Sequence, residues 1–115
     1  MFDFQKLIVY QKAKQFYHEA LIHVIWNNRV DLGMKDQLRR AARSIAHNIA
    51  EGAGKYTKPD KRRYYVCAKA SVYECFAALE LIEMEMLISK TVMDNFHNQL
   101  VELSKMLTGL IKSQS

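Results

Sequence analysis

The 115-residue sequence is poor in the residues that interrupt helices, and it lacks any long apolar run. One proline and four glycines are too few for the many turns of an all-β chain. Half of the residues are hydrophobic and a quarter are charged, which excludes intrinsic disorder and indicates one folded domain over residues 1–115. No segment approaches the roughly 18 apolar residues of a membrane span. The first residues also lack the basic-then-apolar order of a secretion signal, so we expect a cytoplasmic protein with no membrane partner.

Cysteine is scarce as well, and the spacing of the two cysteines excludes a disulfide between them. Cys67 and Cys75 are eight residues apart in a stretch of helical periodicity, which places them roughly 12 Å apart along a helix axis. A disulfide requires Cα atoms within about 7 Å of each other. We expect both cysteines to be small core residues in a reducing compartment.

What the sequence has in abundance is apolar residues that recur every three or four positions, the period of an amphipathic helix. The second helix is expected to end at the Gly-Ala-Gly of residues 52–54, with a glycine in the left-handed conformation. Four such helices with short connections predict an all-α fold, an antiparallel up-and-down four-helix bundle. The predicted helices span residues 8–27, 32–52, 58–88 and 90–112.

Three helices also carry start signals. Asp31 is a candidate N-cap of the second helix, and Thr57 precedes a proline at position 59 in the first turn of the third. Ser89 or Thr91 is expected to cap the last helix. These signals support the predicted boundaries at the amino ends.

Positive charge is concentrated in one part of the chain. The formal net charge is +5, but residues 29–69 hold eleven Lys or Arg against four acidic residues, a local balance of +7. This asymmetry indicates either a polyanion-binding face or a solvated helix face. Tyrosines at positions 56, 64 and 65 lie among the basic residues and offer rings for stacking on bases. The candidate nucleic-acid-binding residues are Arg39, Arg40, Arg43, Lys55, Lys58, Lys61, Arg62 and Arg63.

The third predicted helix has a second apolar stripe that the bundle core does not need. Ala70, Ala77 and Met84 recur every seven residues, with Tyr73 and Leu81 beside them. An exposed apolar stripe marks contacts between proteins, whereas isolated surface alanines carry no meaning. We interpret these five residues as a candidate homo-oligomer interface.

No catalytic, metal or cofactor motif is present. A di-iron bundle needs repeated Glu-x-x-His pairs, and none occurs in the sequence. The His-Glu-x-x-His zinc motif is absent too, and the Gly-Ala-Gly-Lys of residues 52–55 lacks the spacing of a phosphate-binding loop. We therefore expect a protein without enzymatic activity, metal or cofactor.

Several segments resemble one known family. The opening DFQKLIVYQKA of residues 3–13 and the QLRRAARSIAHNIAEG of residues 37–52, with Ser71, Glu74 and the GLI of residues 109–111, are similar to the 23S rRNA-intervening sequence proteins, also called S23 ribosomal proteins or four helix bundle proteins. The turn before the last helix departs from the family pattern, because residues 86–89 are Met-Leu-Ile-Ser where a glycine and an aromatic residue are usual.

The resemblance implies an up-and-down four-helix bundle that assembles into a ring-shaped homopentamer, and it implies no catalytic residues. Related accessory variability determinant proteins of diversity-generating retroelements use a basic pentamer surface to engage RNA and a reverse transcriptase. The family signature is expected to hold the second and third helices together or to join subunits. Its residues here are Arg40, Ser44, Asn48, Glu51, Ser71 and Glu74.

Three functional hypotheses follow. The first is a non-enzymatic, homo-oligomeric RNA-binding protein or ribonucleoprotein scaffold that engages structured RNA. The second is an adaptor that docks a protein partner, such as a polymerase, on the oligomer surface. The third is an enzyme whose site forms only between subunits.

Overall fold

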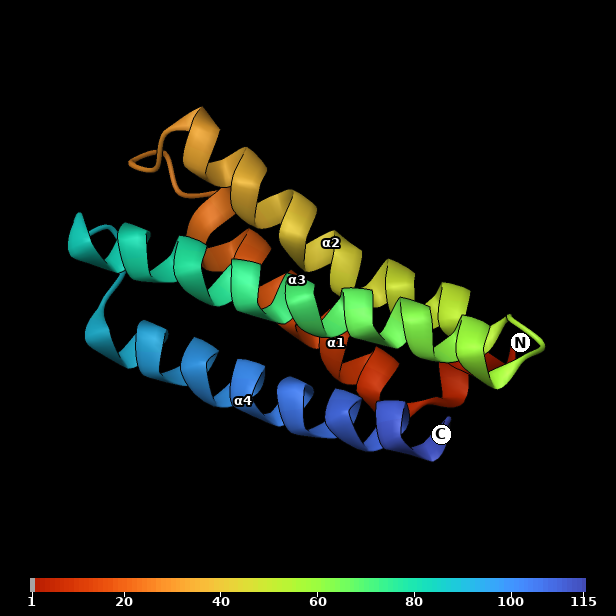
Figure 1. The fold of residues 1–115 in the computed structure, drawn as a ribbon. Helices are drawn as coiled ribbons and strands as arrows, with labels where there is room; N and C mark the ends of the chain where they lie inside the picture. Colours follow the sequence, from red (N-terminus) through yellow and green to blue (C-terminus); the bar gives the residue numbers. More distant parts are fainter. Residues whose placement is uncertain (1) are drawn as a thin grey trace.

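The structure, a computed structural model, describes residues 2–115 and consists of four long helices. A short 3₁₀ helix precedes them, and a π-helical turn extends the first. Each long helix packs against the next in the chain, and the last packs against the first, as Figure 1 shows. The all-α four-helix bundle predicted from the sequence is confirmed. The elements are η1 (Asp3–Lys6), α1 (Ile8–Ala20), η2 (Leu21–Ile25), α2 (Leu32–Ala53), α3 (Lys58–Met84) and α4 (Lys90–Ser113).

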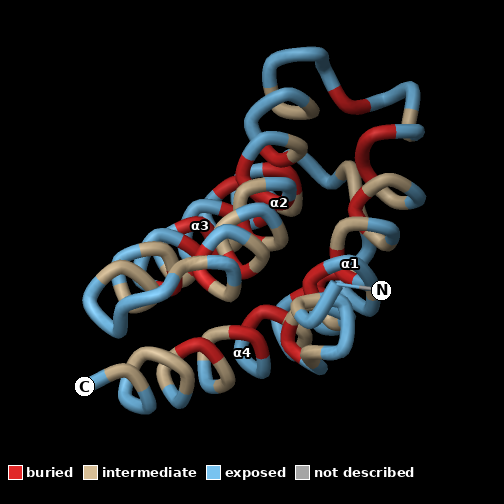
Figure 2. The backbone as a smooth tube through the Cα atoms, turned by 90° about the vertical axis from the view of Figure 1, so that its right-hand side faces the viewer, coloured by how far each residue is buried: buried red, intermediate tan, exposed pale blue. Residues whose placement is uncertain are grey.

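The core lies between the four helices, where the buried stretches of the tube in Figure 2 turn inward. Phe16 of α1 packs edge-to-face on Phe96 of α4, with ring centroids 5.6 Å apart. Leucine and isoleucine side chains fill most of the remaining core and are fully buried, and burying each stabilises the fold by about 1.5–3 kcal/mol. They include Leu38, Ile45, Ile49, Leu79, Ile82, Leu100, Leu103 and Leu107.

The start signals in the sequence act as expected. The Asp31 carboxylate accepts a hydrogen bond from the Met34 amide at 2.8 Å at the start of α2. The Thr57 hydroxyl accepts one from the Asp60 amide at 3.2 Å at the start of α3. Ser89, rather than Thr91, caps α4 by accepting a bond from the Val92 amide at 3.1 Å. Each cap satisfies an amide that the helix itself leaves without a partner.

Two predicted helices are shorter than expected. The first does not continue as an α-helix to residue 27, because it widens into the π-helical turn η2 after Ala20. The third ends at Met84 instead of residue 88, because Met86 adopts the left-handed conformation (φ 59°) and stops the helical hydrogen bonds. Leu87 and Ile88 then turn back onto the core.

The predicted left-handed glycine at the end of α2 is wrong. Gly54 has φ −84°, and all glycines in residues 2–115 have negative φ or near-extended backbone. The α2 carbonyls are satisfied instead by Lys61, whose ammonium donates to the carbonyl oxygens of Ala53 at 2.9 Å and Gly52 at 3.4 Å. A cation at a helix carboxyl end also complements the negative pole of the helix dipole.

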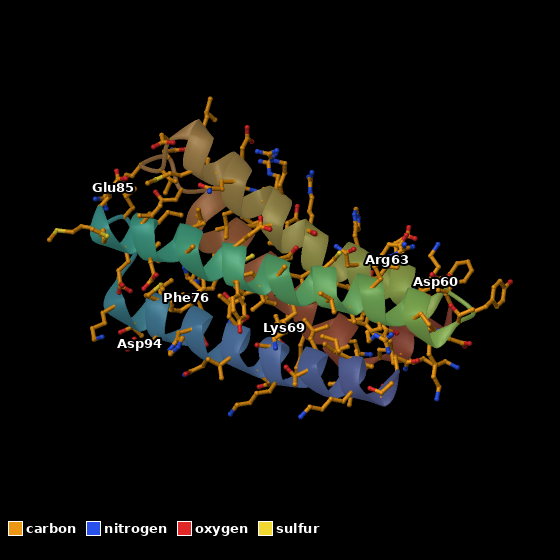
Figure 3. The ribbon with its side chains drawn as sticks, in the orientation of Figure 1. Asp60, Arg63, Lys69, Phe76, Glu85 and Asp94 are labelled. Atoms are coloured by element: carbon orange, nitrogen blue, oxygen red, sulfur yellow. The ribbon has the colours of Figure 1, made fainter. Side chains whose placement is uncertain are left out.

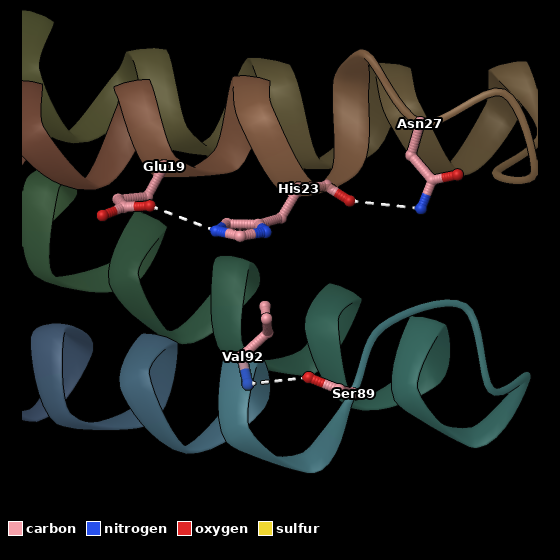
Figure 4. A network of polar contacts seen from close by, with 5 residues as sticks. All are labelled: Glu19, His23, Asn27, Ser89 and Val92. Carbon is pink, nitrogen blue, oxygen red and sulfur yellow. Dashed lines mark hydrogen bonds and ion pairs between the residues drawn. The ribbon is translucent and has the colours of Figure 1, made fainter.

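The opposite end of the bundle is held by the Asn27 amide. Its nitrogen donates to the His23 carbonyl at 3.3 Å and to the Leu87 carbonyl at 3.1 Å, which ties the α1–α2 loop to the α3–α4 turn. Nearby, His23 lies 3.3 Å from the Glu19 carboxylate, as Figure 4 shows.

The described part of the chain has no helix with the length and apolarity that crossing a bilayer requires.

The two cysteines differ, although both were expected in the core. Cys75 is fully buried, but Cys67 is exposed. Burial, with a smaller effect from the neighbouring Glu74 carboxylate, raises the pKa of the Cys75 thiol far above its ordinary value. Eight residues bring Cys67 about 80° away from Cys75 around the helix, enough to move it off the buried face.

Candidate nucleic-acid interface

The candidate basic residues fall into two groups, which we call the junction cations and the α2 cations. The junction cations surround the α2–α3 turn, and the α2 cations lie further back on α2. Arg43 lies ten residues before the end of α2 at Ala53, or about 15 Å along the helix axis. The junction cations are Lys55, Lys58, Lys61, Arg62 and Arg63, and the α2 cations are Arg39, Arg40 and Arg43.

Two of the junction cations hold the fold together. Lys61 is half-buried against the carboxyl end of α2, as described above. The Arg62 guanidinium is also half-buried and donates from Nη1 to the Gln114 carbonyl oxygen at 2.8 Å, which ties α3 to the end of α4. Their hydrogen-bonding groups are therefore committed within the chain, which sequence reasoning could not show.

The other junction cations are more accessible. Lys55 and Arg63 lie over the ring of Tyr64, with the Lys55 ammonium 5.1 Å and the Arg63 guanidinium carbon 5.4 Å from its centroid. Figure 3 shows Arg63 beside Asp60, and the two charged groups are 3.8 Å apart. Lys58 is exposed and makes no hydrogen bond or ion pair within residues 2–115. These three cations remain available to an external anion.

The tyrosines of the basic segment also differ in how exposed they are. Tyr65 is buried, and burial raises the pKa of its phenol. Its ring covers Gly52, whose position would place a Cβ only 2.6 Å from the Tyr65 Cε1 atom. Tyr56, in the α2–α3 turn, is 100% exposed and is the ring best placed to meet a base.

The α2 cations lie on the outer face of α2. Arg43 donates from Nε to the Tyr17 hydroxyl of α1 at 3.0 Å and stays exposed. Arg39 is half-exposed and Arg40 is exposed, and neither makes a hydrogen bond or ion pair within the described residues. The outer face of α2 therefore carries two arginines without intramolecular partners.

The signature residues divide into an internal and an external set. Ser71 of α3, 4% exposed, and Ser44 of α2 have hydroxyl oxygens 2.8 Å apart. The Asn48 amide donates to the Ser44 hydroxyl at 2.9 Å and to the Ser44 carbonyl at 2.8 Å. The Ser71–Ser44 bond joins α3 to α2, and Asn48 holds Ser44 from within α2.

The remaining signature residues face outward. Arg40, Glu51 and Glu74 are exposed, and Glu51 pairs only loosely with Lys55 at 3.9 Å. Surface ion pairs of this kind contribute at most about 1 kcal/mol, so the pair with Lys55 gives Glu51 only a small role in stability.

The predicted oligomer stripe is exposed along α3. Tyr73 is 63%, Leu81 51% and Met84 78% exposed, and Ala70 and Ala77 are exposed between them. Val66, 49% exposed, extends the stripe by one turn. Sequence reasoning missed Val66, although its position four residues before Ala70 carried the signal.

An apolar groove runs beside this stripe between α3 and α4. Its volume is about 420 Å³. Phe76 lies on the α4 side of α3 in Figure 3, with its ring centroid 5.2 Å from that of His97. Sequence reasoning did not predict the groove, which is lined mainly by Val72, Tyr73, Phe76, Ala77, Leu100 and Val101.

A second pocket, of about 500 Å³, lies where η1 meets the last turns of α2. The sequence did not predict this pocket, because Phe4, which supplies its aromatic wall, lies far from the other lining residues in the sequence. The pocket is lined by Phe4, His47, Ala50, Glu51, Gly54 and Lys55.

Residues 2–115 contain no group of three His, Cys, Asp or Glu side chains that could hold a metal ion.

The model of one protein family, described as 23S rRNA-intervening sequence protein, matches residues 5–109, nearly the whole chain. The chain belongs to this family. The resemblance carried by residues 3–13 and 37–52 is thereby confirmed.

Among solved structures, the chain is similar to the crystal structure of a protein of unknown function from the S23 ribosomal protein family of Bacteroides thetaiotaomicron VPI-5482. The TM-score is 0.83 at 23% sequence identity, over 91% of this chain and 96% of the other. At this identity the similarity establishes the fold. No curated protein matches the chain.

Proposed function

We propose that this member of the 23S rRNA-intervening sequence protein family is a non-enzymatic, homo-oligomeric RNA-binding protein or ribonucleoprotein scaffold of the cytoplasm. The observation that carries the proposal is that Arg39, Arg40 and Lys58, on α2 and the α2–α3 turn, make no hydrogen bond or ion pair within residues 2–115.

The chemistry of this face suits phosphates better than bases. Lys and Arg neutralise backbone phosphates and release their counterions, so binding weakens steeply with salt and depends little on sequence. Arg40 and Arg63 present guanidinium groups that can bond two oxygens of one phosphate. The exposed Tyr56 ring adds a surface on which an unpaired base can stack.

A second copy of the chain is the proposed occupant of the apolar stripe and groove. The stripe supplies exposed apolar side chains over five turns of α3, and the groove beside it offers space for side chains of a neighbour. The ring-shaped pentamer implied by the family resemblance would repeat the basic face around its circumference. Several weak phosphate contacts would then act together through avidity.

The RNA-binding proposal is tested with nuclease-treated protein, a structured RNA and a salt series. Arg40→Glu reverses one α2 cation, and Lys90→Glu makes the same charge change on α4, outside the basic segment. We expect Arg40→Glu to weaken binding about tenfold or more and to lower the salt slope by about 1 per lost phosphate contact, whereas Lys90→Glu has little effect.

Equal losses in the two variants would show that only net charge matters and would exclude the α2 face. Absence of binding near physiological salt would overturn the RNA proposal. Partners that remain bound after nuclease treatment would then favour the alternative, an adaptor that docks a protein on this surface.

The oligomer proposal is tested by sedimentation velocity with a matched pair of exposed leucines. Leu81 belongs to the stripe, whereas Leu32 is 77% exposed at the start of α2 and lies outside it. We expect Leu81→Arg to dissociate the assembly and Leu32→Arg to leave it intact. A wild-type chain that sediments as a monomer at high concentration would overturn the proposal.

A further inference from the structure

The pocket between η1 and α2 brings three chemical features together. Its volume of about 500 Å³ falls within the range of pockets that bind small molecules. It has an aromatic side chain, a cation and a carboxylate on its lining, contributed by Phe4, Lys55 and Glu51. It lies next to the junction cations, because Lys55 belongs to both.

The aromatic wall is fixed in place by η1. The Phe4 ring packs edge-to-face on Tyr10, with centroids 4.9 Å apart. The turn that holds Phe4 is closed by the Gln5 side chain, which accepts from the Phe2 amide at 2.8 Å. The Leu7 amide donates to the Phe4 carbonyl at 3.1 Å. Phe4 is half-exposed and does not belong to the core cluster, and the exposed Phe2 ring lies parallel to its ring with centroids 6.0 Å apart.

The lining of the pocket includes one positively charged and one negatively charged side chain. The Lys55 ammonium and the Glu51 carboxylate are 3.9 Å apart, and both side chains are more than one-third exposed. A loose pair in water gives up little when either group turns to a ligand. The ammonium suits a phosphate, and the carboxylate suits the amino group of a base.

Gly54 lines the pocket, and the fold does not require a glycine at this position. Gly54 has an ordinary φ of −84°, and a Cβ there would meet only the carbonyl oxygens of Glu51 at 3.6 Å and Ala50 at 3.7 Å. Neither backbone conformation nor packing therefore requires glycine. Gly52 differs, because the Tyr65 ring leaves no room for a side chain. What Gly54 provides is open space in the pocket.

We propose that this pocket binds one unpaired nucleotide of RNA, with its base against Phe4, its phosphate toward Lys55 and a base amino group donating to Glu51. The proposal rests on the RNA-binding function and adds a preference to it. A base within a duplex is stacked and paired and cannot reach Phe4, so the pocket selects single-stranded RNA.

The test compares a single-stranded oligocytidylate with a perfect RNA duplex of the same length. Cytosine carries an amino group that a carboxylate can bind. Phe4→Leu removes the stacking surface but keeps an apolar side chain. Because stacking contributes about 1–3 kcal/mol per base, we expect the affinity for the single strand to fall about fivefold or more and the affinity for the duplex to stay unchanged. The control is Trp26→Leu, an exposed aromatic residue outside the pocket, which should change neither affinity.

A second variant, Gly54→Leu, fills the pocket without changing any charge. It should reproduce the selective loss seen in Phe4→Leu. If both variants bind the duplex and bind the single strand as tightly as the wild type does, the pocket proposal is wrong and the RNA-binding proposal stands. Equal losses for the two RNAs would also overturn the pocket, because they would indicate an effect on the fold. Absence of binding to either RNA by the wild type would overturn both proposals.

Discussion

The two sides of α3 are built in opposite ways. On the side that faces α2, Ser71 and Ser44 bond across the interface, and the Tyr65 ring lies directly on Gly52. On the side that faces α4, Phe76 and His97 meet above an apolar groove of about 420 Å³. The first interface is closed by small and polar residues, whereas the second is left open beside an exposed stripe.

The difference separates the residues of α3 that stabilise the fold from large apolar residues that the single chain leaves exposed. The closed side uses residues whose size and hydrogen bonding suit only each other, so these positions serve stability. The open side leaves large apolar groups such as Tyr73 and Leu81 exposed to water, which is typical of a surface that contacts another protein. Three predictions test this contrast, in order of decreasing effect on stability.

The largest effect is expected at Gly52. In Gly52→Ala the new Cβ would lie 2.6 Å from Tyr65 Cε1 and 3.2 Å from the Lys61 carbonyl oxygen, so the ring must move out of a closed interface. We expect a loss of about 2–3 kcal/mol in the free energy of unfolding, measured by urea denaturation. The matched control is Gly54→Ala, which should be neutral or slightly stabilising because the site has space and an ordinary φ. Similar losses in both variants would contradict the close packing.

The next effect concerns the pH dependence of stability. Burial raises the pKa of Cys75 in the folded state above the ordinary 9.0, so the unfolded chain ionises first as pH rises. The contribution is therefore intact below the ordinary pKa and is lost above it, by about 1.4 kcal/mol at about pH 10. Buried Tyr65, whose pKa is raised in the same direction, adds to the loss at higher pH.

Urea midpoints across this pH range measure the effect. Cys75→Ala should lower stability at neutral pH but flatten its decline above the ordinary thiol pKa. Cys67→Ala is the matched control, because it removes the exposed thiol and leaves the buried one in place. An unchanged decline in Cys75→Ala would show that the thiol does not cause it.

The smallest effect is expected at the serine pair. Ser71→Ala should cost about 1 kcal/mol, because it removes one hydrogen bond and leaves the Ser44 hydroxyl with Asn48 as its partner. The double variant Ser44→Ala with Ser71→Ala should cost less than the sum of the single variants. A thermal-denaturation cycle measures this coupling, and strict additivity would mean that the two hydroxyls act independently.

The parts of the structure that could be predicted from the sequence depend on near neighbours. Asp31, Thr57 and Ser89 cap helices because a side chain and an amide three residues on meet by local geometry alone. Helical periodicity likewise fixed the core positions and the apolar stripe of α3. The end of α3 was missed because no glycine marks it, and Met86 takes the left-handed conformation in its place.

The candidate site was only partly predictable for the same reason. Charge patterning located the basic segment, but the bond of Arg62 to the Gln114 carbonyl depends on where α4 ends in space. The pocket brings Phe4 against residues some fifty positions later in the chain. Such distant pairings follow from packing, which local sequence rules do not describe.

The hydrogen bonds of Asn27 couple the two halves of the chain at the end of the bundle opposite the α2–α3 turn. The α1–α2 and α3–α4 hairpins meet there through the Asn27 amide, which bonds the carbonyl of His23 in the first and of Leu87 in the second. The Arg29 guanidinium adds a second link by donating from Nη2 to the Met86 carbonyl at 3.4 Å. A hairpin cannot swing open at this end without breaking these bonds, so both loops belong to one cooperative unit. The α2–α3 turn and its junction cations are thus carried on two hairpins that are tied together at their opposite end.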